Sequence, residues 1–156
     1  MTHRLRVLTI AFLLILAPVL RAQSPSDGAS DDSNARPPVT EADLRIVQRA
    51  AQILDSPSKW NRSDNRRCPI EARTFSLYCA LEKASNEVAG SFQHRSAVMQ
   101  QTRFVIDDIA PNRNTYKHRL MDYNNDPTTT FADIQKVFQL SQERITKRLA
   151  EESPKK

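Results

Sequence analysis

Residues 130–149 read T-F-A-D-I-Q-K-V-F-Q-L-S-Q-E-R-I-T-K-R-L. The apolar residues of this stretch recur every three or four positions, which is the period of an amphipathic α-helix and not of a strand. Thr130 and Asp133 have the spacing of a helix N-cap and its reciprocal partner, so we expect the helix to begin at Thr130. Its predicted buried face comprises Phe131, Ile134, Val137, Phe138, Ser141, Ile145 and Leu149.

The same period predicts a helix near the start of the domain. This helix begins at Thr40, again with an aspartate three residues later, and ends before Pro57 because a residue that precedes proline is disfavoured in a helix. Its predicted buried residues are Leu44, Val47, Ala51 and Leu54.

A second helix is predicted from Cys68-Pro69 to a left-handed C-cap at Gly90. It is apolar on both sides, which is typical of a central helix. One face carries Ile70, Thr74, Leu77, Leu81, Ala84 and Val88, and the other carries Phe75, Tyr78 and Cys79.

Two further helices complete the pattern. One starts near Arg95 or Ser96, ends at Pro111 and buries Val98, Thr102, Val105, Ile106 and Ile109, and a short one carries Tyr116, Leu120 and Tyr123. No stretch alternates strictly between apolar and polar residues, as a half-buried strand would. The predicted fold class is therefore all-α: a single compact domain of four to five helices over residues 40–150, with a frayed tail at 151–156.

The composition excludes several classes of site. The 156 residues include only two glycines, two cysteines and three histidines. A Gly-rich phosphate loop needs more glycines, and a structural zinc site needs more soft ligands. We therefore predict no cofactor and no metal.

The N-terminus predicts export. Residues 1–22 have a basic start, an apolar stretch too short to cross a bilayer, and Ala22 as the cleavage position, which together indicate a signal peptide and no permanent membrane span. The expected location is secreted or periplasmic.

Residues 23–39 are mostly Ser, Pro, Asp, Gly, Ala and Asn, so we predict a disordered linker. Loss of the leader lowers the net charge from +5 to +2, which argues against nucleic acid as a partner.

Two cysteines in an exported chain favour a disulfide. Yet an unbroken helix from Pro69 would hold Cys68 and Cys79 ~16 Å apart, beyond the ~7 Å limit on the Cα separation. The bond can form only if the helix starts near Thr74 and residues 69–73 turn back. Both alternatives stay open.

The loop around Trp60 is basic. A tryptophan isolated in a loop usually covers the core with its N–H on a carbonyl, and the alternative is ligand stacking. Its arginines predict a contact face for an envelope protein or an anionic polymer, and the alternative is a solvated loop without a partner. With the polar turn that follows, the candidate binding residues are Trp60, Arg62, Arg66, Arg67, Tyr123, Asn124, Asn125 and Asp126.

The polar turn allows two other functions. One is calcium binding, because the turn has the ligand spacing of an EF-hand calcium loop, at Asp122, Asn124, Asp126, Thr128, Thr130 and Asp133. However, Pro127 occupies the position where that loop needs glycine. The alternative is a tight turn followed by a helix cap.

The second function is enzymatic. His118 and Asp122 lie four residues apart, so on a helix they would form the acid–base pair of a small hydrolase or lyase, or a hydrogen-bonded pair with a purely structural role.

Several of these pieces occur together in one order. A helix at 44–54 leads to Trp60-Asn61, then Cys79-Ala80-Leu81, then Tyr123-Asn124-Asn125-Asp126 with threonines before the closing helix. This order resembles an uncharacterised family of small bacterial and phage helical domains, although Tyr123 with an extra Asn replaces that family's Trp-Asn-Asp. The resemblance covers residues 40–149 and implies one helical domain without an assigned activity. We interpret the protein as an exported binding module.

Overall fold

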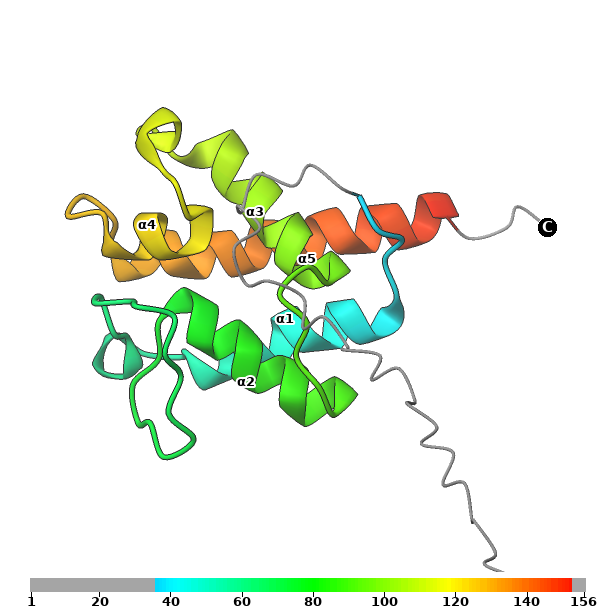
Figure 1. Ribbon diagram of the computed structural model, residues 1–156. Helices are drawn as coiled ribbons and strands as arrows, with labels where there is room; N and C mark the ends of the chain where they lie inside the picture. The colour runs from blue at the N-terminus through cyan, green and yellow to red at the C-terminus, as the bar shows by residue number, and fades with distance from the viewer. Residues whose placement is uncertain (1–35, 153–156) are drawn as a thin grey trace, which may run out of the picture.

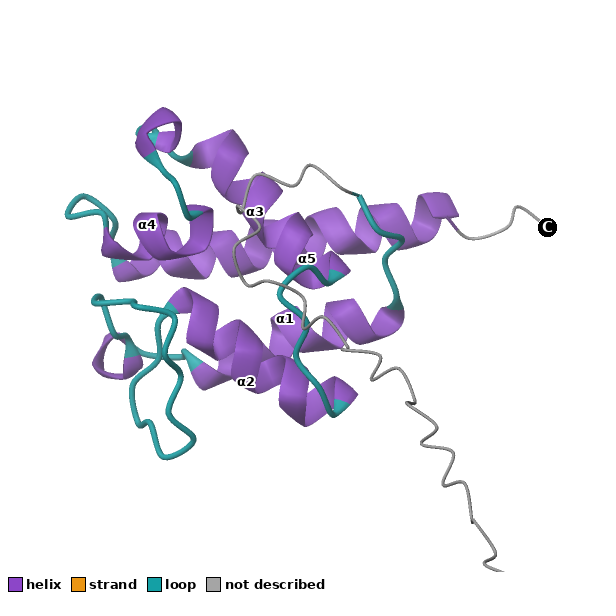
Figure 2. Cartoon of the chain, viewed as in Figure 1, coloured by secondary structure: helices purple, strands orange, loops and turns teal. Residues whose placement is uncertain are grey.

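The computed structural model describes residues 36–152, which form a bundle of five α-helices (Figure 1). Within that range there is no strand beyond the isolated bridge between Trp60 and Phe75 (Figure 2), so the all-α prediction is confirmed. The elements are α1 (Glu41–Ile53), η1 (Pro57–Lys59), α2 (Leu77–Ala89), α3 (Ala97–Ile109), η2 (Arg113–Thr115), α4 (Arg119–Asn125) and α5 (Phe131–Glu152).

Helix α1 packs against α2 and α5, and α5 also packs against α3 (Figure 1). The short helix α4 lies against α3 and α2. Apolar side chains from all five helices meet in one core. Fully buried members include Leu77, Leu81, Met99, Ile106, Leu120, Ile134, Phe138 and Ile145.

The start of α1 is fixed by the predicted capping pair. The Oδ2 of Asp43 accepts from the backbone N–H of Thr40 at 2.8 Å, while the Thr40 side chain accepts from the Asp43 N–H. The other oxygen of Asp43 accepts from the N–H of Val98 at 3.0 Å, which joins the N-termini of α1 and α3. The predicted stripe is partly right: Val47 and Leu54 are fully buried, whereas Leu44 and Ala51 are only partly buried.

Helix α2 begins at Leu77 and not at Pro69. Ser76 caps it by accepting from the N–H of Cys79 at 3.2 Å. Residues 69–73 lie outside the helix, and Ile70, predicted for its buried face, is 92% exposed. The helical period of residues 70–74 is therefore coincidental. Gly90 does provide the predicted left-handed C-cap, with φ +73°.

The helix that is buried all round is α3. Every residue from Ala97 to Ile106 is buried, including Gln100, Thr102 and Arg103. The sequence pattern predicted instead that the second helix, from Cys68-Pro69 to Gly90, is the central one. That prediction was wrong because an apolar pattern does not identify a helix whose polar side chains are buried. The predicted limits at Ser96 and Pro111 agree with the observed helix, which has Ser96 as its N-cap.

Both ends of the described chain pack on the domain. Val39 is buried and its N–H donates to Glu152 at 3.1 Å, so residues 36–39 belong to the fold and not to the predicted linker. Glu151 and Glu152 continue α5, so they are not part of a frayed tail. The predicted signal peptide, the rest of the linker and residues 153–156 lie outside the described residues.

Among residues 36–152, no helix combines the length and the apolar character that crossing a bilayer requires.

Candidate functional site

Cys68 and Cys79 form a disulfide, with their Cα atoms 5.3 Å apart. Of the two alternatives, the chain adopts the one in which residues 69–73 turn back, and the N–H of Ala72 donates to the carbonyl of Pro69 at 3.1 Å within that turn. Cys79 lies in the first turn of α2. The bond therefore fixes the segment before α2 to the helix itself. We call residues 60–76 the cysteine loop.

The two ends of the cysteine loop are paired. The N–H of Asn61 donates to the carbonyl of Phe75 at 2.9 Å, and the N–H of Phe75 donates to the carbonyl of Lys59 at 2.7 Å. Because Phe75 is buried, this short parallel bridge anchors the base of the loop to the core.

Asn124, at the end of α4, is the residue on which the loop rests. Its side-chain oxygen accepts from the indole N–H of Trp60 at 2.9 Å and from the N–H of Leu77 at 3.0 Å. Its amide nitrogen donates to the carbonyl of Asn61 at 2.9 Å and to Oδ1 of Asn125 at 3.1 Å. Asn124 is fully buried, and these bonds use its complete donor and acceptor capacity.

Asn125 makes a second connection. Its Oδ1 accepts from the N–H of Asp64 at 2.7 Å, and its Nδ2 donates to the carbonyl of Asp64 at 2.8 Å. One amide side chain thus pairs with both backbone groups of one loop residue.

Trp60 covers the core, as predicted. Its ring packs on Phe131 with centroids 6.2 Å apart, and the guanidinium of Arg62 lies 4.9 Å from the ring centroid. Arg62 also donates to the carbonyls of Asp126 and Pro127, at 3.2 and 3.1 Å. The tryptophan N–H acceptor is a side-chain amide and not a backbone carbonyl. With these contacts, the indole has a structural role.

Asp126 organises the turn between α4 and α5. Its carboxylate accepts from the N–H and hydroxyl of Thr128, from Nδ2 of Asn112 and from the hydroxyl of Tyr116, at 2.6–3.0 Å. These donors hold the pKa of Asp126 well below its usual range. Burial and the contact with Asp126 raise the pKa of Tyr116, and burial raises the pKa of Tyr123 to about 12.

His118 and Asp122 do not both lie within one helix, because α4 begins at Arg119 and His118 is its N-cap. The Asp122 carboxylate accepts from the backbone N–H groups of Lys117 and His118, at 2.6 and 2.7 Å. Asp122 thus caps the start of the helix, which corresponds to the structural alternative. No geometry here assigns it to a hydrolase or lyase.

The oxygens with EF-hand spacing are used in helix caps and in the turn. Asp133 accepts from the N–H and the hydroxyl of Thr130, at 2.8 and 2.6 Å, which caps α5 as predicted. Asp122, Asn124 and Asp126 are engaged as described above. In the described part of the chain, no three His, Cys, Asp or Glu side chains gather in a way that could hold a metal ion.

A family model for a family of unknown function, DUF6197, matches residues 38–141. The chain belongs to this family. No curated protein and no solved structure matches it. The resemblance to an uncharacterised family is thereby confirmed, whereas the match does not test a bacterial or phage origin. The matched range contains both the cysteine loop and the turn that holds it.

One buried acid of this DUF6197 domain was missed by the sequence analysis. Asp64 is 6% exposed, and its Oδ1 accepts from the N–H of Arg66 at 2.7 Å. Arg66 has φ +58°, a left-handed conformation that this hydrogen bond stabilises. Burial raises the pKa of Asp64, and burial together with the charge of Asp64 raises the pKa of Glu82. The only sequence signal was an acid within a basic loop.

The outer side of the cysteine loop is exposed. Ile70 is the only large hydrophobic side chain in residues 36–152 that is exposed. Four arginines of the same loop are also exposed, against Glu71 as the one exposed acid. We call this set the basic loop surface; it comprises Arg62, Arg66, Arg67, Ile70 and Arg73.

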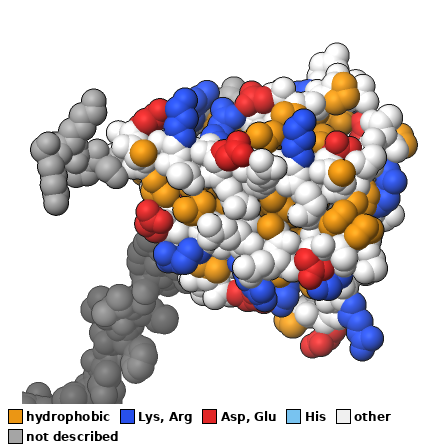
Figure 3. All heavy atoms as spheres, turned by 180° about the vertical axis from the view of Figure 1, so that it is seen from behind, with side chains coloured by type: hydrophobic (Ala, Val, Ile, Leu, Met, Phe, Trp, Pro, Cys, Tyr) orange, Lys and Arg blue, Asp and Glu red, His pale blue; other side chains and the backbone are white. Residues whose placement is uncertain are grey.

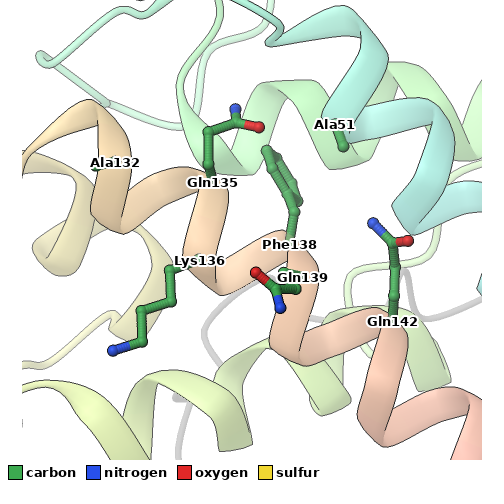
Figure 4. Close-up of a pocket in the computed structure, with 7 residues that line it drawn as sticks. All are labelled: Ala51, Ala132, Gln135, Lys136, Phe138, Gln139 and Gln142. Carbon is green, nitrogen blue, oxygen red and sulfur yellow. The ribbon is translucent and has the colours of Figure 1, made fainter.

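The DUF6197 domain also has a shallow groove of about 660 Å³ between α1 and α5 (Figure 4). Phe138 forms part of its lining, and Gln135 donates to the carbonyl of Leu54 at 2.6 Å. The groove is lined by Ala51, Ala132, Gln135, Lys136, Phe138, Gln139 and Gln142.

On the side of the molecule opposite to Figure 1, small apolar patches alternate with polar groups and with charges of both signs (Figure 3).

Proposed function

We propose that this protein is an exported binding module whose basic loop surface docks on an acidic envelope protein. The observation that carries the proposal is the 92% exposure of Ile70 on a loop that a disulfide and a buried asparagine hold in place. A large apolar side chain on a restrained loop contributes to binding without a large cost of ordering.

The surroundings of Ile70 support an acidic partner. Arg66, Arg67 and Arg73 are exposed on the same loop. Arginine is one of the residue types that contribute most to the binding energy of protein interfaces. An anionic polymer would pair with the arginines but offers no apolar pocket for Ile70, so the exposed isoleucine favours a protein.

Export itself rests on the leader and is supported by the disulfide. Disulfides persist in oxidising compartments and are rare in the cytosol. N-terminal sequencing of the protein recovered outside the cytoplasm tests this step. We expect the chain to begin at Gln23; an intact N-terminus on cytosolic protein would contradict export.

Docking is tested in living cells by replacing Ile70 with the photo-crosslinking residue p-benzoylphenylalanine. The control carries the same residue at the exposed position Asn86 on α2. We expect a discrete adduct with an acidic protein from position 70 only, identified by mass spectrometry. The same pattern from both positions, or an adduct with a polymer, would contradict the proposal.

The charge requirement is tested by the double variant Arg66→Glu/Arg67→Glu in the crosslinking background. Its matched control is Arg45→Glu/Lys136→Glu, which changes two exposed cations by the same charge elsewhere. We expect the adduct to fall at least tenfold in the first variant and to persist in the second. Equal adduct yields would show that the basic loop surface does not select the partner.

A further inference from the structure

The disulfide between Cys68 and Cys79 joins two sulfurs in unlike surroundings. Cys68 belongs to the cysteine loop and is partly exposed, whereas Cys79 is only 7% exposed. Cys79 is the third residue of α2, and Ser76 is the N-cap of that helix. An incoming thiol therefore reaches the bond from the side of Cys68.

The position of Cys79 favours it as the sulfur that leaves. The N-terminal end of a helix carries a partial positive charge, which stabilises a thiolate placed there. In thiol–disulfide exchange, the sulfur that is better stabilised as a thiolate is displaced faster. Attack on Cys68 with departure of Cys79 is thus the favoured direction.

The part of the cysteine loop that depends on this bond is residues 65–73. Within the described chain, the hydrogen bonds of this segment end inside the loop: the donors are the N–H groups of Arg66, Arg67 and Ala72, and the acceptors are side chains of Asp64 and Asn65 and the carbonyl of Pro69. The link to α2 is the disulfide, with a 3.6 Å contact between the carbonyl of Arg67 and Sγ of Cys79. Cys68 and Ala72 are partly buried, and all other residues of the segment are exposed.

The base of the cysteine loop is held without the sulfurs. The side chains of Asn124 and Asn125 on α4 bind Trp60 and Asp64, and the bridge between Asn61 and Phe75 closes the base. Neither cysteine takes part in these contacts. Breaking the disulfide is therefore expected to free residues 65–73 and to leave the base of the loop in place.

We propose that the disulfide between Cys68 and Cys79 is a site of thiol–disulfide exchange with a dithiol reductant, and that its reduction releases residues 65–73 while the domain stays folded. The released segment carries most of the basic loop surface. The exchange does not depend on the docking proposed above, because it concerns the bond that restrains this surface and not the partner.

The exchange has two steps. One thiolate of the reductant attacks Sγ of Cys68, the S–S bond breaks, and its electron pair leaves with Sγ of Cys79. The second thiolate of the reductant then attacks the reductant's own sulfur in the mixed disulfide and displaces Sγ of Cys68. The reductant is oxidised to a disulfide, and the protein disulfide becomes two thiols once water protonates the thiolates.

The release is tested by NMR of the purified protein, first oxidised and then reduced with dithiothreitol. We expect the amide signals of residues 65–73 to move toward the positions of an unfolded segment, while the indole N–H signal of Trp60 keeps its position. Unchanged signals from residues 65–73 would show that the bond does not restrain them. Movement of the Trp60 signal to its unfolded position would show that the release is not local. Either result contradicts the proposal.

The direction of attack is tested with glutathione, a small thiol that forms mixed disulfides. Iodoacetamide added during the reaction alkylates the cysteine that leaves, and peptide mass spectrometry locates both groups. We expect glutathione on Cys68 with the alkyl group on Cys79, in about tenfold excess over the reverse arrangement. Equal amounts of the two arrangements, or an excess of the reverse one, would contradict the roles assigned to the two sulfurs.

Discussion

The indole N–H of Trp60 donates a 2.9 Å hydrogen bond to the side-chain oxygen of Asn124, 64 residues further along the chain. The same oxygen accepts from the N–H of Leu77 at the start of α2. One buried amide thus joins the cysteine loop, the N-terminus of α2 and the end of α4. The loop is held by side-chain bonds to α4 as well as by its disulfide.

Asn124→Ala is expected to lower the free energy of unfolding by about 2–4 kcal/mol, because it leaves buried donors without an acceptor. Asn125→Ala is the matched comparison. Asn125 is exposed, so water can replace its bonds, and we expect a loss of about 1 kcal/mol. Urea unfolding of both variants measures the difference. If the two losses are equal, Asn124 does not have the central role assigned to it.

The sequence could identify Trp60 and Asn124 as notable residues but not as partners. Local patterns predict caps and turns because those contacts lie within a few residues, as between Thr130 and Asp133. The bond between Trp60 and Asn124 depends on how α4 packs against α2, which no local pattern encodes. For the same reason, the two predicted binding segments were not recognised as one structural unit.

The helices were predictable to the extent that burial followed hydropathy. Three helix limits were predicted correctly, because a cap depends on residues that are close together in the sequence. They are the N-caps at Thr40 and Ser96 and the C-cap at Gly90. The region around Ile70 was not predictable, since its spacing fits a helix although the disulfide turns the chain back. The complete burial of α3 was not predictable either, because several of its buried residues, such as Arg103, are polar.

Reduction of the disulfide is expected to lower the free energy of unfolding by about 3 kcal/mol, the value for releasing a closed loop of this length. The bond between Cys68 and Cys79 spans 11 residues. Urea unfolding with and without dithiothreitol measures the effect. The variant Cys68→Ala/Cys79→Ala should be destabilised to a similar degree and should not respond to the reductant. A wild-type midpoint independent of dithiothreitol would contradict a stabilising bond.

The two capping aspartates are expected to differ in strength. Asp43 caps α1 and also accepts from the N–H of Val98, whereas Asp133 caps only its own helix. We expect Asp43→Ala to cost about 2–3 kcal/mol and Asp133→Ala about 1 kcal/mol. Thermal unfolding of both variants at pH 7 gives the comparison. A cost for Asp133→Ala equal to that for Asp43→Ala would mean that the bond to α3 adds no stability.

Asp64 is expected to make the cysteine loop less stable as the pH rises. Burial raises the pKa of Asp64, so the folded state binds this proton more tightly than the unfolded chain does. The stabilisation is complete below the unfolded pKa and is lost as the pH rises through the folded pKa. Asp64→Asn should therefore raise the thermal midpoint at pH 7 and have little effect at pH 3.

The reference for this measurement is Asp133→Asn, for which the sign is opposite. Hydrogen bonds from Thr130 lower the pKa of Asp133, so its contribution is present above the unfolded pKa and is lost as the pH falls through the folded pKa. This variant should lower the midpoint at pH 7 and approach the wild type in acid. Because both variants remove one carboxylate, general charge effects move them in the same direction. A fall in the midpoint for both at pH 7 would show that Asp64 is stabilised as a carboxylate and not strained by burial.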